Sequence, residues 1–216
     1  MIKCVIFDMD GVLINTEPVH FGIWKQICAE RGVTLEYDRY IECIGSTLVF
    51  LYDLLQKWYG LSFHHDPTVQ NRYADLKAQH MREHGVPEVK GAAAAVKKLY
   101  EKGYLLAVAS SSAPEYIDYS MKELGIDKYF CRMVSGEQVA HPKPAPDVFL
   151  EAAKQLQCTP EECLVIEDSR NGSLAAKAAG MVCLGFYNPD SGNQDLSAAD
   201  EIFTDFSKLP DMKYFP

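Results

Sequence analysis

The sequence predicts an α/β fold in which a doubly wound parallel sheet carries an inserted all-helical domain. Three observations support this. The chain opens on an apolar run, residues 5–7, that ends at two acids. Residues 37–85 show helical patterns without an interrupting strand pattern, and from about residue 90 helix and strand patterns alternate strictly. Because the first strand must pair with the later ones, we expect a core from residues 1–14 and 88–216, with a helical cap domain from residues 15–87.

Composition excludes several classes of partner. The chain has 216 residues, of which 48% are hydrophobic, and this is enough for one large core plus a smaller domain. A formal net charge of -9 argues against nucleic acid and against anionic membranes, since both would be repelled. A small phosphorylated metabolite stays open as a partner, because local cations and a metal can override the global field.

The cysteines and the N-terminus indicate a cytoplasmic protein, which we expect to be a monomer. Seven cysteines are scattered without a C-x-x-C pair, as is typical of reduced thiols: Cys4, Cys28, Cys43, Cys131, Cys158, Cys163 and Cys183. The chain enters a strand at once, with no basic-then-apolar signal segment, and no apolar run approaches membrane-spanning length.

The first strand ends at the motif around which the chain is organised. Asp8 and Asp10 are two residues apart, so in extended chain they project to the same side, and Gly11 allows a turn close to a ligand. Two neighbouring carboxylates repel each other unless a cation or a proton lies between them. Hard oxygen ligands favour Mg²⁺. The alternative is a capped strand end with two solvated acids.

The next helix is expected from residue 17 to about residue 31, with a polar cap and Pro18 at its start and Gly32 at its end. Thr16, His20 and Trp24 follow one another at intervals of four and therefore share one helix face. That face could look back at the acids. The alternative is that Trp24 belongs to the core and His20 is a satisfied helix histidine.

The cap and the later core are expected to contain regular elements in a simple order. Cap helices are predicted at residues 37–41, 47–59 and 67–84, and residues 63–66 are interpreted as a surface loop rather than a metal cluster. Strands are predicted at 105–109, 131–134, 164–166 and 182–184, alternating with helices at 92–102, 114–124, 146–156 and 171–179. The tail, 188–216, is predicted to be a loop with a short strand near Ile202.

Polar residues follow the other strands as well. Ser110 and Ser111 come at the end of the second strand, Lys143 stands in a proline-rich loop, and Glu167 and Asp168 end the fourth strand. Each alone reads as a capping serine, a solvated lysine or capping acids. Because all of them fall at strand ends of one parallel sheet, we expect them to converge on one crevice with the first acid pair.

These residues together resemble the four ordered motifs of the haloacid-dehalogenase (HAD) superfamily of phosphotransferases. The resemblance covers essentially the whole chain. It is strongest to the β-phosphoglucomutase and sugar-phosphate phosphatase branch, which shares the Lys-Pro-x-Pro-Asp stretch at 143–147 and the Ile-Glu-Asp-Ser stretch at 166–169. The resemblance implies a Rossmann-like core and a helical cap that closes over the substrate.

The resemblance also implies roles for the core residues. Asp8 would be the nucleophile that forms an aspartyl-phosphate, and Asp10 the acid and base. Mg²⁺ would be held by Asp8, the Asp10 carbonyl and Asp168, with Glu167 in support. The residues expected to hold phosphate or substrate are Ser110, Ser111, Lys143, Thr16, His20 and Trp24.

Departures from the mutase pattern favour hydrolysis. Leu48 and Ala113 stand where the mutase uses an arginine and a lysine for its second phosphate, and neither residue can bind a dianion. Arg72 falls where the mutase has a cap lysine, so it either touches the substrate or is a solvated helix residue. We therefore expect a Mg²⁺-dependent phosphatase of small phosphorylated sugars or polyols. The mutase and a non-catalytic phosphate or sugar-phosphate sensor are the alternatives, and dehalogenase chemistry, which does not need the Asp10 acid, is disfavoured.

Overall fold

The chain forms two compact units. The computed structural model describes residues 1–44, 48–192 and 194–216. The first unit comprises Met1–Asn15, Val86–Pro189 and Gln194–Pro216, and the second comprises Thr16–Gly85 with a short segment that begins at Asp190. The sequence did not indicate that this short segment groups with the helices. Each unit is described by itself below.

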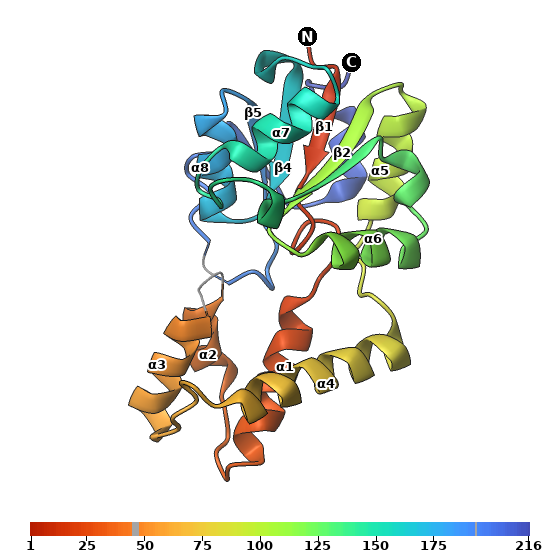
Figure 1. Ribbon diagram of the computed structural model, residues 1–216. Coiled ribbons are helices and arrows are strands. Elements are labelled where there is room, and N and C mark those ends of the chain that lie inside the picture. The colour runs from red at the N-terminus through yellow and green to blue at the C-terminus, as the bar shows by residue number, and fades with distance from the viewer. Residues whose placement is uncertain (45–47, 193) are drawn as a thin grey trace. The chain divides into compact units, whose positions relative to one another are not determined.

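The first unit is built on a six-stranded sheet, which confirms the predicted fold class. Its order is β3-β2-β1-β4-β5-β6, and all its pairs are parallel. The strands are β1 (Cys4–Phe7), β2 (Leu105–Ser110), β3 (Arg132–Ser135), β4 (Cys163–Glu167), β5 (Val182–Phe186) and β6 (Glu201–Phe203) (Figure 1). The chain leaves β1 toward β3 on one side and returns through β4 on the other. The strand order therefore reverses beside β1, where such sheets bind ligands.

Helices cover both faces of this sheet. On one face, Val5 and Phe7 pack with residues of α5 (Ala92–Glu101) and α6 (Pro114–Glu123). On the other face, Cys4 and Ile6 pack with residues of α7 (Asp147–Gln155) and α8 (Arg170–Ala178). Successive residues of β1 alternate between the two clusters, as a strand buried on both faces requires. Three short 3₁₀ turns join these elements: η2 (Asp127–Tyr129), η3 (Gly136–Gln138) and η4 (Pro160–Glu162).

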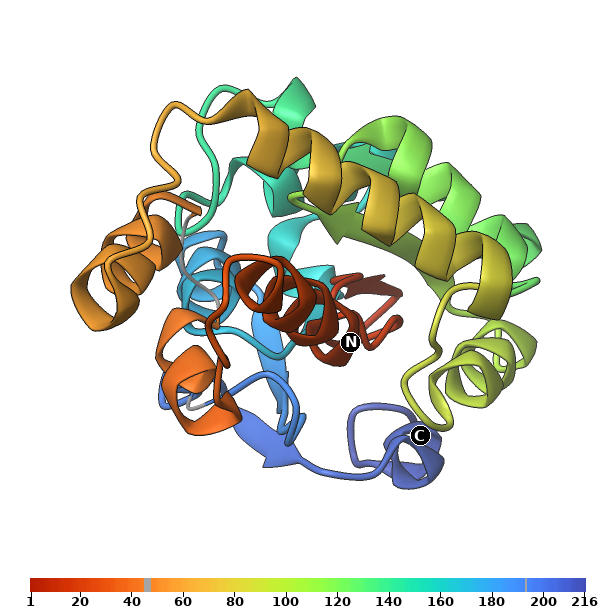
Figure 2. The same cartoon turned by 90° about the horizontal axis from the view of Figure 1, so that it is seen from below.

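The C-terminal part of the chain is more ordered than predicted. The short strand near Ile202 is confirmed as β6, but a 3₁₀ helix, η5 (Phe206–Asp211), follows it and packs beside α5 (Figure 2). Phe206, Leu209 and Phe215 are fully buried. The apolar residues of this segment are irregularly spaced around Pro210, so no helical period marked it in the sequence.

The second unit is helical throughout its described elements. They are α1 (Glu17–Ala29), α2 (Tyr37–Tyr40), the 3₁₀ turn η1 (Ile41–Cys43), α3 (Leu48–Tyr59) and α4 (Pro67–His84). The expected start of the third helix, Thr47, lies outside the described residues. Asp66 caps α4 by accepting a hydrogen bond from the Thr68 amide at 2.9 Å, while His64 pairs with Asp53 at 2.9 Å. Residues 64–66 form the expected loop at the surface, but Phe63 is 1% exposed and packs against Trp24 and Tyr52, so the surface interpretation is wrong for this residue.

An aromatic cluster forms the core of the helical unit. The Trp24 ring stacks on Tyr73 with centroids 5.2 Å apart, and its edge meets Tyr52 at 5.8 Å. Phe63 packs against both Trp24 and Tyr52.

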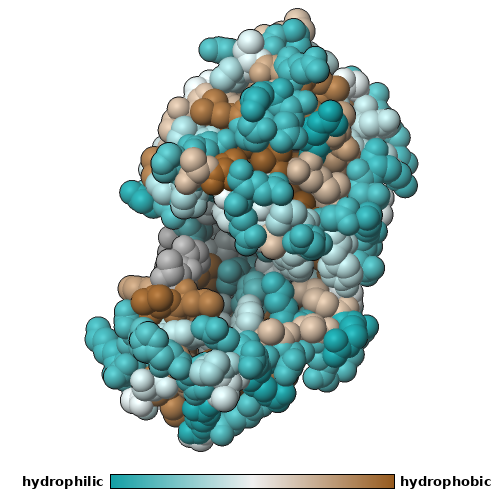
Figure 3. Space-filling model, in the orientation of Figure 1, coloured by the Kyte–Doolittle hydropathy of each residue, from teal (hydrophilic) through white to brown (hydrophobic). Residues whose placement is uncertain are grey.

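The face shown in Figure 3 is mostly hydrophilic on both units, with scattered apolar patches. None of the helices described here combines the length and the apolar character that crossing a membrane would need.

Candidate active site

The loop after β1 presents the first acid pair. Asp8 follows the last residue of β1, and its amide donates to the Ile166 carbonyl of β4 at 2.9 Å. The chain then turns at Gly11, whose φ of 85° lies in the left-handed region that glycine tolerates. The side-chain amide of Asn188, which is 6% exposed, donates to the Gly11 carbonyl at 2.9 Å. This loop is therefore fixed from two sides, and the carboxyls at its entrance are held in place.

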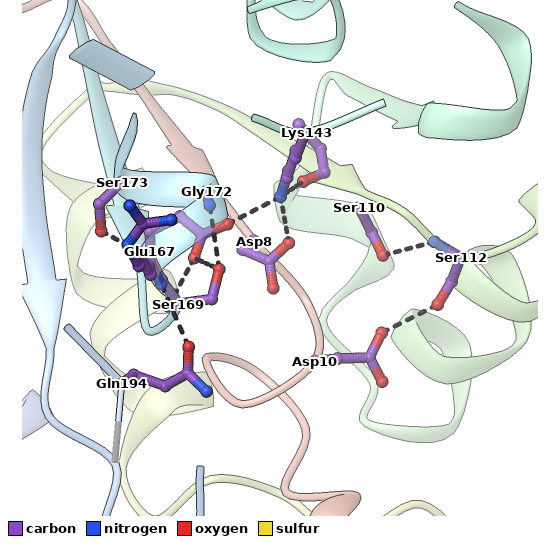
Figure 4. Close-up of polar contacts among 12 residues, drawn as sticks. Asp8, Asp10, Ser110, Ser112, Lys143, Glu167, Ser169, Gly172, Ser173 and Gln194 are labelled. Atoms are coloured by element: carbon purple, nitrogen blue, oxygen red, sulfur yellow. Dashed lines mark hydrogen bonds and ion pairs between the residues drawn. The ribbon is translucent and has the colours of Figure 1, made fainter. Parts of the chain in front are cut away.

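Lys143 connects the carboxyl end of β1 to the carboxyl end of β4. Its Nζ donates to Asp8 Oδ1 at 2.6 Å and to Glu167 Oε1 at 2.8 Å. A third hydrogen bond reaches the Ala109 carbonyl of β2 at 3.2 Å. Figure 4 shows the three charged side chains pointing toward one another. The ammonium group, with a side chain only 8% exposed, thus links three neighbouring strands at their carboxyl ends.

Burial and charge act against each other in this cluster. Burial raises the pKa of the Asp8 carboxyl to about 8, although the Lys143 ammonium acts in the opposite direction. For Lys143, burial alone would lower the pKa, but the carboxylates of Asp8 and Glu167 outweigh burial and leave the pKa raised. Lys143 therefore stays protonated. Asp8 needs further positive charge beside it to be ionised at neutral pH.

Glu167 is held by the start of α8. Its Oε2 accepts hydrogen bonds from the Ser169 amide at 2.9 Å and from Ser169 Oγ at 2.8 Å. Gly172 lies directly against this carboxylate, because a Cβ added there would be 1.6 Å from Glu167 Oε1. The carboxylate is 1% exposed and is satisfied on both oxygens (Figure 4). The Glu167 carboxylate is therefore fixed in place, and it orients Lys143 through their hydrogen bond.

Serines at the ends of β2 and β3 surround the second acid. Ser112 Oγ donates to Asp10 Oδ2 at 2.9 Å, and the Ser112 amide donates to Ser110 Oγ at 3.0 Å. Ser135 Oγ donates to the Ser112 carbonyl at 2.7 Å, which fixes the turn (Figure 4 shows the Ser110–Ser112–Asp10 chain). Ser110 is 1% exposed, whereas Ser111 is exposed to solvent.

The donor set at the ends of β1 and β4 fits Mg²⁺. Asp8 and Asp168 are 7% and 6% exposed and stand directly after paired strands. Both supply carboxylate oxygens, and an Asp10 carbonyl would add a third hard ligand. Among the described residues, no three side chains of His, Cys, Asp or Glu gather as a metal cluster. The expected set needs only two carboxylates and one main-chain carbonyl, and a divalent cation would supply the positive charge that Asp8 requires.

Thr16, His20 and Trp24 belong to the helical unit, and Trp24 has the packing position that the sequence analysis gave as the alternative. Trp24 is 2% exposed and lies in the aromatic cluster, so it does not present a flat wall to a ligand. His20 Nδ1 shares a hydrogen bond with the Tyr73 hydroxyl. Thr16 is 2% exposed at the start of α1. Trp24 on this face of α1 is therefore packed, while His20 stays partly exposed, and helical spacing alone does not distinguish the two cases.

Arg72, for which the sequence left a substrate contact and a solvated helix residue open, lies in an ion pair. Its guanidinium binds Glu30 through two nitrogens, with a closest approach of 2.6 Å. Both side chains are more than a third exposed, so this is a surface ion pair between α4 and the end of α1. The alternative, a solvated helix residue, fits better. Leu48, at the start of α3, is 49% exposed, and Ala113 precedes α6.

Sequence reasoning missed three supporting residues. Ser112 was visible as a neighbour of Ser110, but nothing in the sequence assigned it to Asp10. Gly172 stood inside a predicted helix, where a glycine is a cue for close approach. Asn188 lay in the tail, to which no site was assigned, and its contact with Gly11 spans 177 residues of sequence. Such a distant pairing leaves no local signal.

Comparison with known proteins identifies the family of the chain. Residues 5–186 match the family model described as haloacid dehalogenase-like hydrolase. The chain is 33% identical to YhcW of Bacillus subtilis (strain 168), with 89% of this chain and 86% of YhcW covered. It is 32% identical to the phosphorylated carbohydrates phosphatase of Thermotoga maritima, with 83% and 82% covered.

A solved structure shares the fold over nearly the whole chain. The crystal structure of a HAD family hydrolase from Deinococcus radiodurans R1, with bound phosphate and sodium, superposes with a TM-score of 0.82 and 27% sequence identity. The match covers 96% of this chain and 93% of that one. The similarity therefore extends to both units.

Proposed function

Because the chain belongs to the haloacid dehalogenase-like hydrolase family, we propose that it is a Mg²⁺-dependent phosphatase that hydrolyses small phosphorylated sugars or polyols. The observation that carries the proposal is the buried contact of Lys143 with Asp8 and Glu167 at the reversal of the strand order. In this contact a carboxylate that would serve as the nucleophile lies beside a fixed positive charge. A dianionic phosphate needs both.

In the first step, the Asp8 carboxylate would attack phosphorus. An O–P bond forms to Asp8, and the bond between phosphorus and the alcohol oxygen breaks. Asp10 would give its proton to the departing alcohol. Lys143 and Ser110 would hold phosphoryl oxygens, and the lysine also reduces the repulsion between the nucleophile and its anionic target.

In the second step, Asp10 would take a proton from water, which attacks the phosphorus of the aspartyl-phosphate. Orthophosphate leaves and Asp8 is restored as a carboxylate. The Ser112 hydroxyl, 2.9 Å from Asp10, would hold this carboxyl between the steps. Asp8, Asp168 and the Asp10 carbonyl would hold Mg²⁺, which when bound would neutralise charge on the phosphoryl oxygens.

The choice of a phosphorylated sugar or polyol rests on a relative, and the choice of hydrolysis rests on two positions, one in each unit, that lack a cation. The T. maritima relative is named a phosphatase of phosphorylated carbohydrates. Leu48 and Ala113 offer no cation for a second phosphate. A bisphosphate intermediate that reorients in the site would therefore find no positive charge at these positions. Hydrolysis is favoured over phosphoryl transfer within a sugar.

Phosphate release from a panel of sugar, polyol and nucleotide monophosphates tests the proposal. We expect release from several related sugars or polyols, abolished by a chelator and restored by added Mg²⁺. Conversion of β-glucose 1-phosphate to glucose 6-phosphate is measured in parallel. Isomerisation faster than release would assign the mutase function instead, and tight binding without turnover of any panel member would assign a sensor.

A further inference from the structure

Two cysteines meet at the opposite end of the strands that carry the site. Cys4 is the first residue of β1 and Cys163 is the first residue of β4, and the parallel register pairs them directly. The acids Asp8 and Glu167 stand at the other ends of the same two strands. The thiol pair is therefore separated from the proposed chemistry by the length of the sheet.

The two sulfur atoms are in contact. Cys4 Sγ donates to Cys163 Sγ at 3.0 Å, and both residues are fully buried. Cys163 Sγ also lies 3.2 Å from the Thr159 carbonyl. All seven cysteines of the chain, each within the described residues, are free thiols. The register and the contact place this pair close to what a disulfide between neighbouring strands requires.

The hydrogen bond makes the two thiols unequal. Because Cys4 donates to it, the pKa of the Cys163 thiol is lowered, and the same hydrogen bond raises the pKa of Cys4. A lowered pKa increases the thiolate fraction with which an oxidant reacts, whereas full burial slows the access of the oxidant to this pair. Cys158 lies nearby on the loop before η4 and is half-buried, and burial raises the pKa of its thiol.

We propose that Cys4 and Cys163 form an oxidisable dithiol, which a peroxide converts to a disulfide that joins β1 to β4. The Cys163 thiolate attacks one oxygen of hydrogen peroxide, the O–O bond breaks, and a sulfenic acid and hydroxide form. The Cys4 thiol gives its proton to the hydroxide just formed, and its sulfur attacks the Cys163 sulfur, so that the S–S bond forms and the S–O bond breaks with release of a second hydroxide, which takes up the proton first lost by Cys163. In sum, two thiols lose two electrons and two protons, and hydrogen peroxide becomes two molecules of water.

Closure requires only a small adjustment of the strands. A disulfide brings its sulfurs to about 2.05 Å, so these two atoms must approach by about 1 Å from their 3.0 Å contact. The adjustment occurs at the end of the sheet away from Asp8, so phosphatase turnover should change little. The new bond joins residues 159 positions apart, and it should raise the thermal stability of the oxidised protein.

The experiment compares reduced and peroxide-treated protein by thiol titration and peptide mapping. A double variant, Cys131→Ser with Cys158→Ser, removes the exposed and the half-buried thiol and serves as the matched control. In the double variant we expect loss of two thiols, and in both proteins we expect one linked peptide containing Cys4 and Cys163 and a Tm higher by about 5–10 °C. Dithiothreitol should reverse all three changes.

Three outcomes would overturn the inference. They are a double variant that forms no linked peptide, a link that joins Cys158 to either partner, and oxidation confined to Cys131. Peptide mapping of the wild-type protein decides the question even where a variant does not fold. Since none of these measurements uses phosphatase activity, failure of the proposed function would leave the result intact.

Discussion

The two units of this protein use their charged side chains in opposite ways. In the α/β unit, Lys143 is buried between Asp8 and Glu167, each from a different strand end. In the helical unit, Arg72 meets Glu30 at the surface, where both remain exposed to water. Parallel strands force their carboxyl ends together, so polar residues placed there converge. Helical spacing only assigns residues to a common face, which then either binds a ligand or packs.

The largest expected effect lies at the nucleophile of the α/β unit. Asp8→Asn keeps the shape but removes the carboxylate, so phosphate release should fall by roughly 10⁴-fold or more. Circular dichroism should show an unchanged fold. Asp118→Asn, at an exposed ion pair of α6, is the control and should retain activity. Substantial turnover by Asp8→Asn would rule out an aspartyl-phosphate.

A second test adds one methyl group to each unit by replacing a helical glycine with alanine. In Gly172→Ala, the new Cβ would lie 1.6 Å from Glu167 Oε1, so the carboxylate must move away from Lys143. We expect kcat/KM to fall by roughly 10- to 100-fold, since a residue that orients Lys143 is displaced. Gly22→Ala on α1 is the matched control, because nothing lies within 4 Å of the added Cβ.

The two glycine variants should also differ in stability. Gly22→Ala replaces a helix-interior glycine without a clash, so the free energy of unfolding should rise by about 0.5–1 kcal/mol. Gly172→Ala should lower it, because a buried, hydrogen-bonded acid loses partners. Thermal melts of both variants measure this. Equal activity in both would mean that Glu167 does not position Lys143.

The contrast between units also explains how much could be predicted from the sequence. The boundaries of α4 and the order of core elements followed from capping residues, glycines and apolar runs. Asp8 and Glu167 were singled out because they stand at strand ends, and Lys143 because it stands in a proline-rich loop. The role of Trp24 did not, because its partners Tyr73 and Phe63 come from other segments of the cap. The contact of Asn188 with Gly11 joins distant parts of the chain, and no local pattern records it.

Trp24→Phe distinguishes a packing role from a substrate contact. Loss of part of a buried ring should reduce the free energy of unfolding by about 1–2 kcal/mol, while kcat/KM of the folded protein stays within about twofold. Trp58→Phe, on the partly exposed face of α3, is the control. A tenfold rise in KM for Trp24→Phe without loss of stability would return this residue to the substrate site.

A smaller effect is expected at the ion pair of Asp200 in the α/β unit. Burial alone would raise the pKa of Asp200, but hydrogen bonds from Lys177 and from the Cys183 amide outweigh it and leave the pKa lowered. The ionised form therefore stabilises the fold above the unfolded carboxyl pKa of about 3.9, and this stability is lost as the pH falls through the folded value.

Asp200→Asn should accordingly lower the Tm at neutral pH by a modest amount. The difference from the wild type should stay constant from about pH 8 to pH 5 and shrink below about pH 4. Melting curves across this range test the sign. A difference that grows on acidification would contradict the lowered pKa. Asp205 is an exposed acid that caps η5, and the Tm of Asp205→Asn is measured over the same pH range for comparison.

The smallest effect is expected at Arg72, where the comparison between the units is sharpest. Arg72→Gln removes the charge from an exposed pair, so kcat/KM should stay within about twofold of the wild type. Lys143→Gln removes the charge from the buried cluster and should reduce kcat/KM by roughly 10³-fold. Steady-state kinetics on one sugar phosphate measure both. If Arg72→Gln raises KM tenfold or more while Glu30→Gln does not, Arg72 leaves Glu30 to bind the substrate, and the helical unit supplies a cation to the site after all.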